Sequence, residues 1–466
     1  MNKFYMVSLG CPKNLVDSEK IVGQMMNSGY LHVEELDLAD IIVINTCAFI
    51  DDAWQETLDV INEMIEVKGA GVSGKTSDSS KTLCVIGCAV VKHKADLAEM
   101  RGIDYIDENM DKFLQDRSDA GGKKVDKSKG VKAKKADASG IGRVTSTPFG
   151  MAYLKVAEGC NNHCTFCVIP SIKGKYISRT MEDIIAEAKS LADRNIRELV
   201  LVAQDVAYYG MDLYNKFALA ELVNKLCEID GIEWIRLMYC YPEHITDELI
   251  NVMASQPKVC EYIDIPIQHC SDKVLQAMGR KTNKGQIAQK LVALRDNVQG
   301  LSIRTTMMVG FPNEGKEDYA ELCEFVKEQT FERLGCFKFS PQEGTPAYAM
   351  EQRVSESEKQ ERYDGLMELQ AEVSAHVNVG RISGVEQVMI HKVLDDDALS
   401  ELAELGAKIK PKKGRRVYAS HSRTECYGID GQVIFEGPEY LNIGDLIVVQ
   451  ITDSIGDYDL LANVLI

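Results

Sequence analysis

The sequence predicts an α/β protein with three folded parts: an N-terminal parallel-sheet domain, a central partial barrel of six strand–helix units, and a small C-terminal β-barrel. Three observations predict this arrangement. The chain has 466 residues, which is more than one ordinary hydrophobic core holds. Buried-strand runs alternate with helical periodicity over residues 1–116 and again over 147–380, as in parallel sheets with helical crossovers. In residues 381–466, short strands separated by turns replace that pattern.

The composition is that of an acidic globular protein. Apolar residues make up 45% of the chain, and 53 Lys and Arg stand against 71 Asp and Glu, a net charge of −18. This balance disfavours a general affinity for nucleic-acid phosphates. No apolar run reaches the ~18 residues that span a bilayer, and the first residues show no secretory signal pattern. We therefore expect a cytoplasmic protein, in which the fourteen cysteines favour metal or redox chemistry over disulfides. Eight of them are interpreted as structural or carry no assignment, and six are candidate ligands.

The first domain, residues 1–116, alternates strands with helices. We expect strands at Phe4–Leu9, Ile41–Ile44 and Leu83–Ile86, and helices at Leu15–Met26, Ala53–Val67 and Lys92–Met100. Cys11, Cys47 and Cys88 each follow one of these strands. Because parallel strands end at the same edge of a sheet, the three thiols can converge there. They either hold a [4Fe–4S] cluster with one open iron or are buried cysteines near turns, and spacing alone does not decide.

Residues 69–76 match the phosphate-loop pattern G-x-x-x-x-G-K-[ST] letter for letter. The pattern binds phosphate when a strand precedes the loop and a helix follows it. Here a helical pattern ends near Lys68, and small polar residues follow the match. We interpret the segment as an insertion loop rather than a nucleotide site.

Residues 117–146 contain seven lysines among Gly, Ala, Ser and Asp, without apolar periodicity. This composition predicts a flexible linker. A basic arm that contacts RNA is the alternative.

The second domain, residues 147–380, carries the strongest motif: Cys160, Cys164 and Cys167 in Cys-x3-Cys-x2-Cys spacing. A structural zinc site wants four closed ligands, and His163 is awkwardly placed to be the fourth. Three thiolates instead leave one iron of a cluster free to chelate a substrate. The spacing, with Phe166 just before the last cysteine, resembles the radical S-adenosylmethionine superfamily, and this resemblance implies that Phe166 lies against the adenine.

The rest of this domain predicts six parallel strands, too few to close an eight-stranded barrel. They are expected near Ala152–Val156, Glu198–Val202, Trp234–Met238, Tyr262–Ile265, Ile303–Val309 and Gly335–Phe339. Gln204 and Asp205 end the second strand, and Gln204 is a candidate cofactor-binding residue. Arg304, in the fifth strand, either pairs with the cofactor carboxylate or forms an ion pair on the barrel exterior. We interpret His244 and His269 as turn or packing residues rather than as catalysts.

The C-terminal domain, residues 381–466, predicts a small barrel of oligonucleotide-fold size. Strands are expected at Glu386–His391, Gln432–Phe435, Leu446–Ile451 and Leu460–Val464. From Ser383 onward, eight Lys and Arg stand against fourteen Asp and Glu, a net charge of −6. Such a barrel suits a basic protein better than RNA, although Lys408–Arg416 is locally basic.

Several motifs together resemble the methylthiotransferase family over essentially the whole chain, and they favour its members that modify protein twelve of the small ribosomal subunit. They are Ser8–Asn14, Asn45–Cys47, Gly87-Cys88, Glu158–Cys167, Ile169–Tyr176, Ala203–Asp205, Tyr208–Gly210, Tyr239–Ile245, Asp264–Ser271 and Phe339–Pro346. Members acting on transfer RNA typically carry Gln-Asn where this chain has Gln204-Asp205. Departures from the family pattern are Ala48 for Gly, Asn313–Gly315 for Gly-Glu-Thr, and insertions at 69–81 and 395–414.

The resemblance implies fold, cofactors and partners. The C-terminal barrel would be a TRAM domain and the centre a radical S-adenosylmethionine barrel. Cys160, Cys164 and Cys167 would hold the [4Fe–4S] cluster that cleaves S-adenosylmethionine, and Cys11, Cys47 and Cys88 an auxiliary [4Fe–4S] cluster that carries sulfur. One S-adenosylmethionine would supply the methyl group, and a second the radical that attacks an aspartate Cβ of the ribosomal protein.

Partners implied by the resemblance are the ribosomal protein, a sulfur donor, and an electron donor such as flavodoxin or ferredoxin. Three alternatives are weighed: a transfer-RNA adenosine methylthiotransferase, a non-catalytic iron–sulfur sensor, and a nucleotide hydrolase that depends on residues 69–76. No other catalytic residue is predicted.

Overall fold

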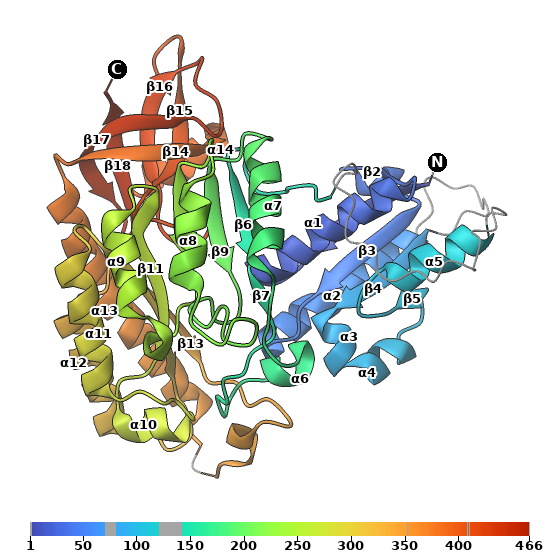
Figure 1. The fold of residues 1–466 in the computed structure, drawn as a ribbon, viewed down its shortest axis with the longest axis horizontal. Coiled ribbons are helices and arrows are strands. Elements are labelled where there is room, and N and C mark those ends of the chain that lie inside the picture. Colours follow the sequence, from blue (N-terminus) through green and yellow to red (C-terminus); the bar gives the residue numbers. More distant parts are fainter. Residues whose placement is uncertain are drawn as a thin grey trace. The chain divides into compact units, whose positions relative to one another are not determined.

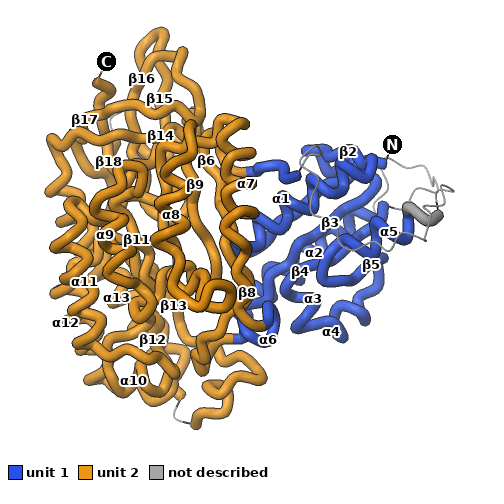
Figure 2. Tube along the Cα trace, viewed as in Figure 1, with its two compact units in different colours: residues 1–146, 168–174 blue, residues 147–167, 175–466 orange. Residues whose placement is uncertain are grey.

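A computed structural model describes residues 2–69, 81–120, 142–351, 353–407, 409 and 411–465. The chain forms two compact units, residues 1–146 with 168–174, and residues 147–167 with 175–466 (Figure 2). The second unit therefore includes both the predicted central barrel and the predicted C-terminal barrel. None of the described helices is long and apolar enough to cross a membrane.

The first unit is built on a five-stranded, all-parallel sheet of order β2-β1-β3-β4-β5 (Figure 1). Its strands are β1 (Lys3–Ser8), β2 (Leu31–His32), β3 (Ile41–Thr46), β4 (Thr82–Gly87) and β5 (Tyr105–Ile106). Its helices are α1 (Pro12–Asn27), η1 (Leu36–Leu38), α2 (Asp51–Gly69), α3 (Cys88–Lys92), α4 (Lys94–Glu99), α5 (Asp111–Ala120) and α6 (Ile169–Lys173). The three predicted strands are thus confirmed as β1, β3 and β4.

Both faces of this sheet are covered by helices, as the unbroken apolar strands predict. On β3, Ile41 and Val43 pack in one core cluster with residues of α1 and α5, such as Val22 and Phe113. Ile42 and Ile44 point the other way, into a cluster with residues of α2 and α3. Because successive side chains of a strand face opposite sides, one buried strand contributes to two cores.

The second unit begins with a six-stranded parallel sheet of order β13-β12-β11-β10-β9-β6. Its strands are β6 (Met151–Lys155), β9 (Glu198–Val202), β10 (Trp234–Leu237), β11 (Val259–Gln268), β12 (Ser302–Val309) and β13 (Arg333–Lys338). A short antiparallel pair, β7 (Ala157–Glu158) and β8 (Ile177–Ser178), lies beside it. All six predicted strands are present. β6 and β13 end the sheet without pairing, so the barrel is partial, as predicted.

Helices cover the outer face of this sheet (Figure 1). The helical elements of this part of the chain are α7 (Met181–Ala192), α8 (Leu219–Cys227), η2 (Pro242–His244), α9 (Asp247–Ser255), α10 (Asp272–Ala277), α11 (Lys284–Asn297), α12 (Lys316–Gln329), η3 (Pro346–Ala349) and α13 (Glu356–Arg381), and the longer ones among them form this cover. Ile235 and Leu237 of β10 join the core cluster beneath these helices, whereas Arg236 between them points into the barrel.

The C-terminal part is a closed barrel of order β14-β15-β16-β18-β17. Its elements are β14 (Val385–Val393), α14 (Asp396–Glu404), β15 (Arg415–Ser422), β16 (Val433–Pro438), β17 (Leu446–Ile455) and β18 (Asp459–Val464). The sequence predicted four of these strands and missed β15. The reason is that β15 ends in Ser420, His421 and Ser422, which are buried polar residues, so the strand lacks the apolar alternation that marks the others.

Part of the predicted linker is ordered. α5 continues to Ala120, and residues 121–141 lie outside the described part of the chain. Beyond them, Arg143 pairs with Glu19 of α1 (Nε–Oε2 2.6 Å), and both side chains are buried. Ser146 also donates its backbone N–H to Glu19 (2.6 Å). A buried carboxylate with these partners holds residues 143–146 against the first unit.

Candidate active site

The loop Cys160–Cys167 follows β6 and β7 at the carboxyl edge of the partial barrel, where sites of such barrels lie. Cys160 and Cys164 are buried, and Cys167 is half-buried. Burial raises the pKa of the Cys160 thiol to about 11. At neutral pH that thiol is protonated unless a bound cation favours the thiolate, as iron does.

The three thiols of this loop converge on one side chain, Tyr241. Burial raises the pKa of Tyr241, and nearby Cys164, Cys160 and Cys167 raise it further. The Tyr241 hydroxyl lies 3.9 Å from Cys164 Sγ. Within the described residues, no three His, Cys, Asp or Glu side chains come close enough to hold a single metal ion. Three thiols from one short loop are one fewer than the four ligands of a closed structural zinc site, and they fit a cluster that keeps one iron open.

Asp205, at the end of β9, braces the cysteine loop. Its buried carboxylate accepts a hydrogen bond from Asn162 Nδ2 (3.0 Å) and contacts His244 Nδ1 (2.6 Å). Tyr176 donates its hydroxyl to the Asp205 backbone carbonyl (2.9 Å). Asp205, which the sequence treated as a mark of substrate class, thus has a structural task. His244 lies in the same packing, consistent with the packing role expected for it.

Gln204 and Phe166 occupy positions suited to a cofactor. Gln204 Nε2 donates to Glu158 Oε1 (3.1 Å), whereas its Oε1 is buried without a hydrogen-bond partner in the described structure. Phe166 packs edge-on to Phe311 (ring centroids 6.4 Å apart) beside the apolar side chains of Met278 and Met308. A buried amide oxygen without a partner is costly, so it indicates a ligand that donates to it.

Gln268, which the sequence placed after the fourth strand without assigning it a role, also has a buried amide oxygen without a partner in the described structure. It is the last residue of β11, and only 8% of its surface is exposed. Its φ is 76°, a strained value for a residue that is not glycine. The available signal was a polar residue ending the apolar run Ile265-Pro266-Ile267.

Arg304 is engaged elsewhere. Its Nη1 lies 3.0 Å from Asp264 Oδ1, and its Nε lies 3.4 Å from Asp430 Oδ1 of the C-terminal barrel. It is the third residue of β12, toward the end of the strand opposite to the cysteine loop. Of the two roles considered for Arg304, this geometry favours the ion pair, although the pair is inside the barrel rather than outside.

Cys11, Cys47 and Cys88 follow β1, β3 and β4 at the carboxyl edge of the first sheet. Gly10 lies so close to Cys47 that a Cβ at position 10 would be 2.8 Å from Cys47 Sγ. Burial raises the pKa of the Cys47 thiol, and Cys11 adds to the shift. The residue after Cys88 is tied in as well, since the Ala89 N–H donates to the Thr46 hydroxyl (3.2 Å). The structure therefore brings the three loops together, as expected from parallel strands.

Asn14 fixes these loops to one another. Its Nδ2 donates to the carbonyls of Leu9 (2.7 Å) and, at longer range, of Asn45 and Thr46 (3.3 Å each). Its Oδ1 is buried without a partner in the described residues. Asn14 thus holds together the loops that carry Cys11 and Cys47.

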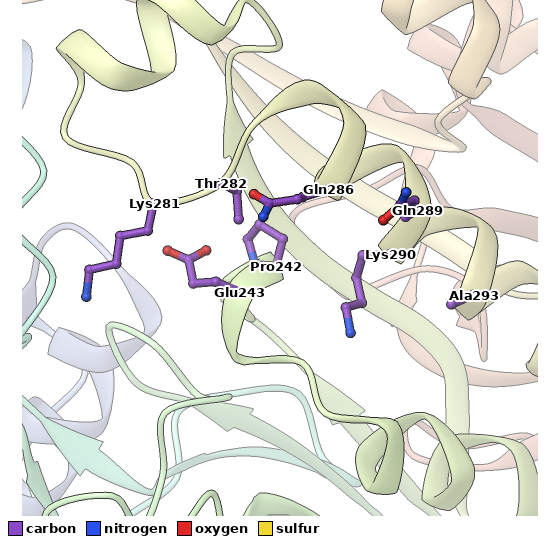
Figure 3. Close-up of a pocket in the computed structure, with 8 residues that line it drawn as sticks. All are labelled: Pro242, Glu243, Lys281, Thr282, Gln286, Gln289, Lys290 and Ala293. Carbon is purple, nitrogen blue, oxygen red and sulfur yellow. The ribbon is translucent and has the colours of Figure 1, made fainter.

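A groove of about 380 Å³, lined mostly by polar side chains, lies in the second unit (Figure 3). Part of its wall follows Tyr241 and Arg280 in the chain. Pro242 and Glu243 follow Tyr241, and Lys281 and Thr282 follow Arg280, while α11 supplies the rest of its wall. Glu243 Oε2 and Thr282 Oγ1 are buried without partners in the described structure.

The phosphate-loop match at 69–76 lies almost entirely outside the described residues. The described element before it is helix α2 and the one after it is strand β4. A phosphate loop needs a preceding strand, so this context does not favour a nucleotide site.

Comparison with known proteins assigns both domains to known families. The family model of the radical SAM superfamily matches residues 154–326, and that of uncharacterized protein family UPF0004 matches residues 3–106. A protein of Clostridioides difficile named ribosomal protein uS12 methylthiotransferase RimO is 39% identical over 100% of this chain and 99% of its own. A protein of the same name from Clostridium botulinum is 40% identical over 99% and 98%.

The chain belongs to the RimO family of methylthiotransferases. It is therefore a transferase with a radical SAM domain, as the resemblance implied. A solved structure, the radical S-adenosylmethionine methyltransferase TsrM from Kitasatospora setae, superposes with a TM-score of 0.54 over 74% of both chains. At 13% identity this likeness supports the fold alone.

Proposed function

We propose that this protein attaches a methylthio group to the Cβ of an aspartate in ribosomal protein uS12, protein twelve of the small subunit. The observation that carries the proposal is the pair of three-cysteine sites, each at the carboxyl edge of its own parallel sheet. Relatives at 38–40% identity over nearly their whole length bear the name of that activity. The cytoplasm, which keeps thiols reduced, suits such sites.

Each group of residues has a distinct task in this proposal. Cys160, Cys164 and Cys167 would hold the [4Fe–4S] cluster, and Cys11, Cys47 and Cys88 a second one. When bound, the first cluster supplies the electron that cleaves S-adenosylmethionine, and the second presents the sulfur. Phe166 would pack against the adenine, while the free amide oxygens of Gln204 and Gln268 would accept hydrogen bonds from the cofactor.

A radical is needed because the Cβ–H bond of aspartate offers no acidic proton to a general base. The substrates in this proposal are uS12, through its aspartate, and S-adenosylmethionine. The reaction also requires an external one-electron donor and a sulfur donor. Proteins that sit on RNA are basic as a rule, and the C-terminal barrel carries a net charge of −6. Opposite charges would steer the encounter between the two proteins.

The charge on that barrel is not all available for docking. Glu425 and Asp430 are buried beneath it, where they face Arg333 and Arg304. Exposed carboxylates gather instead at the start of α14, at Asp395, Asp396 and Asp397.

The test is mass spectrometry of uS12 and of transfer RNA after reaction with the reconstituted protein. We expect the mass of a methylthio group on uS12 and a mark on no adenosine. The Cys160→Ala/Cys164→Ala/Cys167→Ala protein should keep about four irons and lose activity, as should its counterpart lacking Cys11, Cys47 and Cys88. A methylthio mark on adenosine would assign the transfer-RNA activity instead, and iron-free triple variants would refute the two-cluster assignment.

A further inference from the structure

We propose that Arg280 and Tyr241 raise the reduction potential of the cluster held by Cys160, Cys164 and Cys167, by donating hydrogen bonds to Cys164 Sγ. The inference rests on the proposed function, because it takes these cysteines as cluster ligands. Both are positioning residues, since they act through a ligand rather than on the substrate.

Both donors reach the same sulfur. Arg280 Nη1 lies 3.8 Å from Cys164 Sγ, and the Tyr241 hydroxyl lies 3.9 Å from it. The guanidinium is stacked on the Tyr241 ring at 4.2 Å from the ring centre. Cys164 Sγ is thus within hydrogen-bonding reach of two side chains.

Arg280 is rigidly held in this position. Its Nη2 donates to the Pro266 carbonyl (2.6 Å), and its backbone N–H donates to the Leu275 carbonyl (2.9 Å) at the end of α10. The turn at residues 277–280 is also bonded to the cysteine loop. The Thr165 N–H donates to the Met278 carbonyl (2.9 Å), and the Thr165 hydroxyl donates to the Ala277 carbonyl (2.8 Å). A donor fixed to the loop that carries the ligand keeps its distance to that ligand.

The charge of Arg280 needs a counter-charge. The side chain is 7% exposed, and its Nε is buried without a partner in the described structure. Tyr241, Cys164 and Glu243 act electrostatically on the guanidinium. Among the described residues, no carboxylate oxygen lies within 4 Å of it to form an ion pair. A buried cation is stable only beside an anion. Three thiolates around an iron–sulfur cluster supply that anion.

The direction of the effect follows from the charge balance. A [4Fe–4S]²⁺ cluster with three thiolates carries −1, and one electron from an external donor makes it −2, while Arg280 keeps its proton. The donor is oxidised by one electron, and no proton moves. A fixed positive charge and two hydrogen bonds stabilise the more negative state, so they raise the potential and ease reduction.

The experiment uses the full chain with Cys11, Cys47 and Cys88 replaced by Ala, so that the cluster under study is observed alone. EPR-monitored redox titrations would compare Arg280→Met, Arg280→Lys and Tyr241→Phe in that background. The matched control is Lys281→Ala, which removes the neighbouring exposed charge. We expect more negative potentials for Arg280→Met and, to a smaller extent, for Tyr241→Phe, near-normal values for Arg280→Lys, and no shift for Lys281→Ala.

A rescue measurement separates tuning from folding. Cleavage of S-adenosylmethionine by Arg280→Met, driven by dithionite, should slow about tenfold. Such a loss of reduced cluster corresponds to about 59 mV for a one-electron couple. Titanium(III) citrate, a stronger reductant, should restore the rate, which it cannot do for a misfolded site.

Three results would overturn the proposal: unchanged potentials in both Arg280→Met and Tyr241→Phe, no rescue by the stronger reductant, or weaker binding of S-adenosylmethionine at an unchanged potential. The last would make Arg280 a cofactor ligand. If Arg280→Met lost its iron, the potential of Tyr241→Phe would test the proposal alone: a more negative value would support it, and an unchanged value would contradict it. Failure of the proposed function looks different, because Cys164→Ala would then keep the same cluster signal.

Discussion

His421 of the C-terminal barrel and Glu198 of the central barrel meet in a fully buried contact, with His421 Nε2 2.6 Å from Glu198 Oε2. The second oxygen of Glu198 accepts from Arg236 Nε at 2.7 Å. Arg236 in turn donates to the backbone carbonyls of Arg423 and Ser422. One carboxylate from the first residue of β9 therefore organises the junction between the two barrels, which explains why they form a single unit.

Replacing Glu198 by Gln should weaken that junction. The substitution keeps the shape of the side chain but leaves Arg236 buried without its counter-charge, a defect that costs roughly 3–5 kcal/mol. Denaturant unfolding at pH 7 should show this loss. Glu261→Gln is the control, because Glu261 also joins the two barrels, through Arg423 at 2.7 Å, but is about one-third exposed. It should cost below about 1 kcal/mol, and equal losses for the two variants would contradict the argument.

The same carboxylate gives a pH dependence with a defined sign. Burial alone would raise the pKa of Glu198, but Arg236 and His421 outweigh it and lower the pKa from 4.5 to about 2. A lowered folded-state pKa stabilises the protein above pH 4.5, and that contribution is lost as the pH falls from 4.5 to 2. The loss amounts to about 3 kcal/mol. Unfolding free energies measured against pH should show wild type and Glu198→Gln converging toward pH 2, and a constant gap would count against this assignment.

The sequence predicted those parts of the fold that have an apolar pattern and missed those that depend on distant contacts. Most strands of the two parallel sheets are rich in apolar residues, and the positions of their ends predicted that the six cysteines lie at the carboxyl edges of the sheets. β15 was missed because the contact with Glu198 requires His421 and its serine neighbours to be buried there, which removes the apolar pattern. The signal was absent because tertiary contacts, not local preference, determine those residues.

Paired side chains were beyond sequence reasoning for a related reason. Arg304 pairs with Asp264 of the neighbouring strand and with Asp430, 126 residues further along the chain. Arg143 pairs with Glu19, 124 residues before it. Neither spacing reveals such a pair. Arg280 was not singled out, and Gln268 was placed after the fourth strand but given no role. Their significance lies in what they face: Cys164 Sγ for Arg280, and no described partner for the amide oxygen of Gln268.

Gly10→Ala should disturb the auxiliary site. Its φ is 84°, and a Cβ there would be 2.7 Å from Cys47 Cβ and 2.8 Å from Cys47 Sγ. Gly29→Ala is a matched control, with a φ of 88° and nothing within 4 Å. Both variants pay about 1–2 kcal/mol for the left-handed backbone. Gly10→Ala alone should also lower the iron content after reconstitution, and an equal iron content in the two would show that Cys47 holds no cluster.

Gly279→Ala should act in the same way on the radical SAM site. A Cβ there would be 2.6 Å from the His163 carbonyl in the middle of the cysteine loop. Gly300, with a φ of 74° against 71° for Gly279 and no atom within 4 Å, supplies the control. The expected result is comparable strain in both, but loss of S-adenosylmethionine cleavage only in Gly279→Ala. Full cleavage activity in that variant would mean that the turn at 277–280 does not position the loop.

Gln268→Met tests whether the free amide at the end of β11 serves the cofactor. Methionine keeps the length of the side chain and removes a buried oxygen that has no partner in the described structure. Without S-adenosylmethionine, the variant should therefore be as stable as wild type or more stable, by up to about 1–3 kcal/mol. With S-adenosylmethionine, binding should weaken about tenfold, which corresponds to one lost hydrogen bond of about 1.4 kcal/mol. Thermal unfolding and equilibrium binding on the same reconstituted samples give both quantities. If Gln268 served only in packing, the variant would lose stability and keep its affinity for S-adenosylmethionine. A gain of stability together with weaker binding would instead identify an amide that is buried for its ligand.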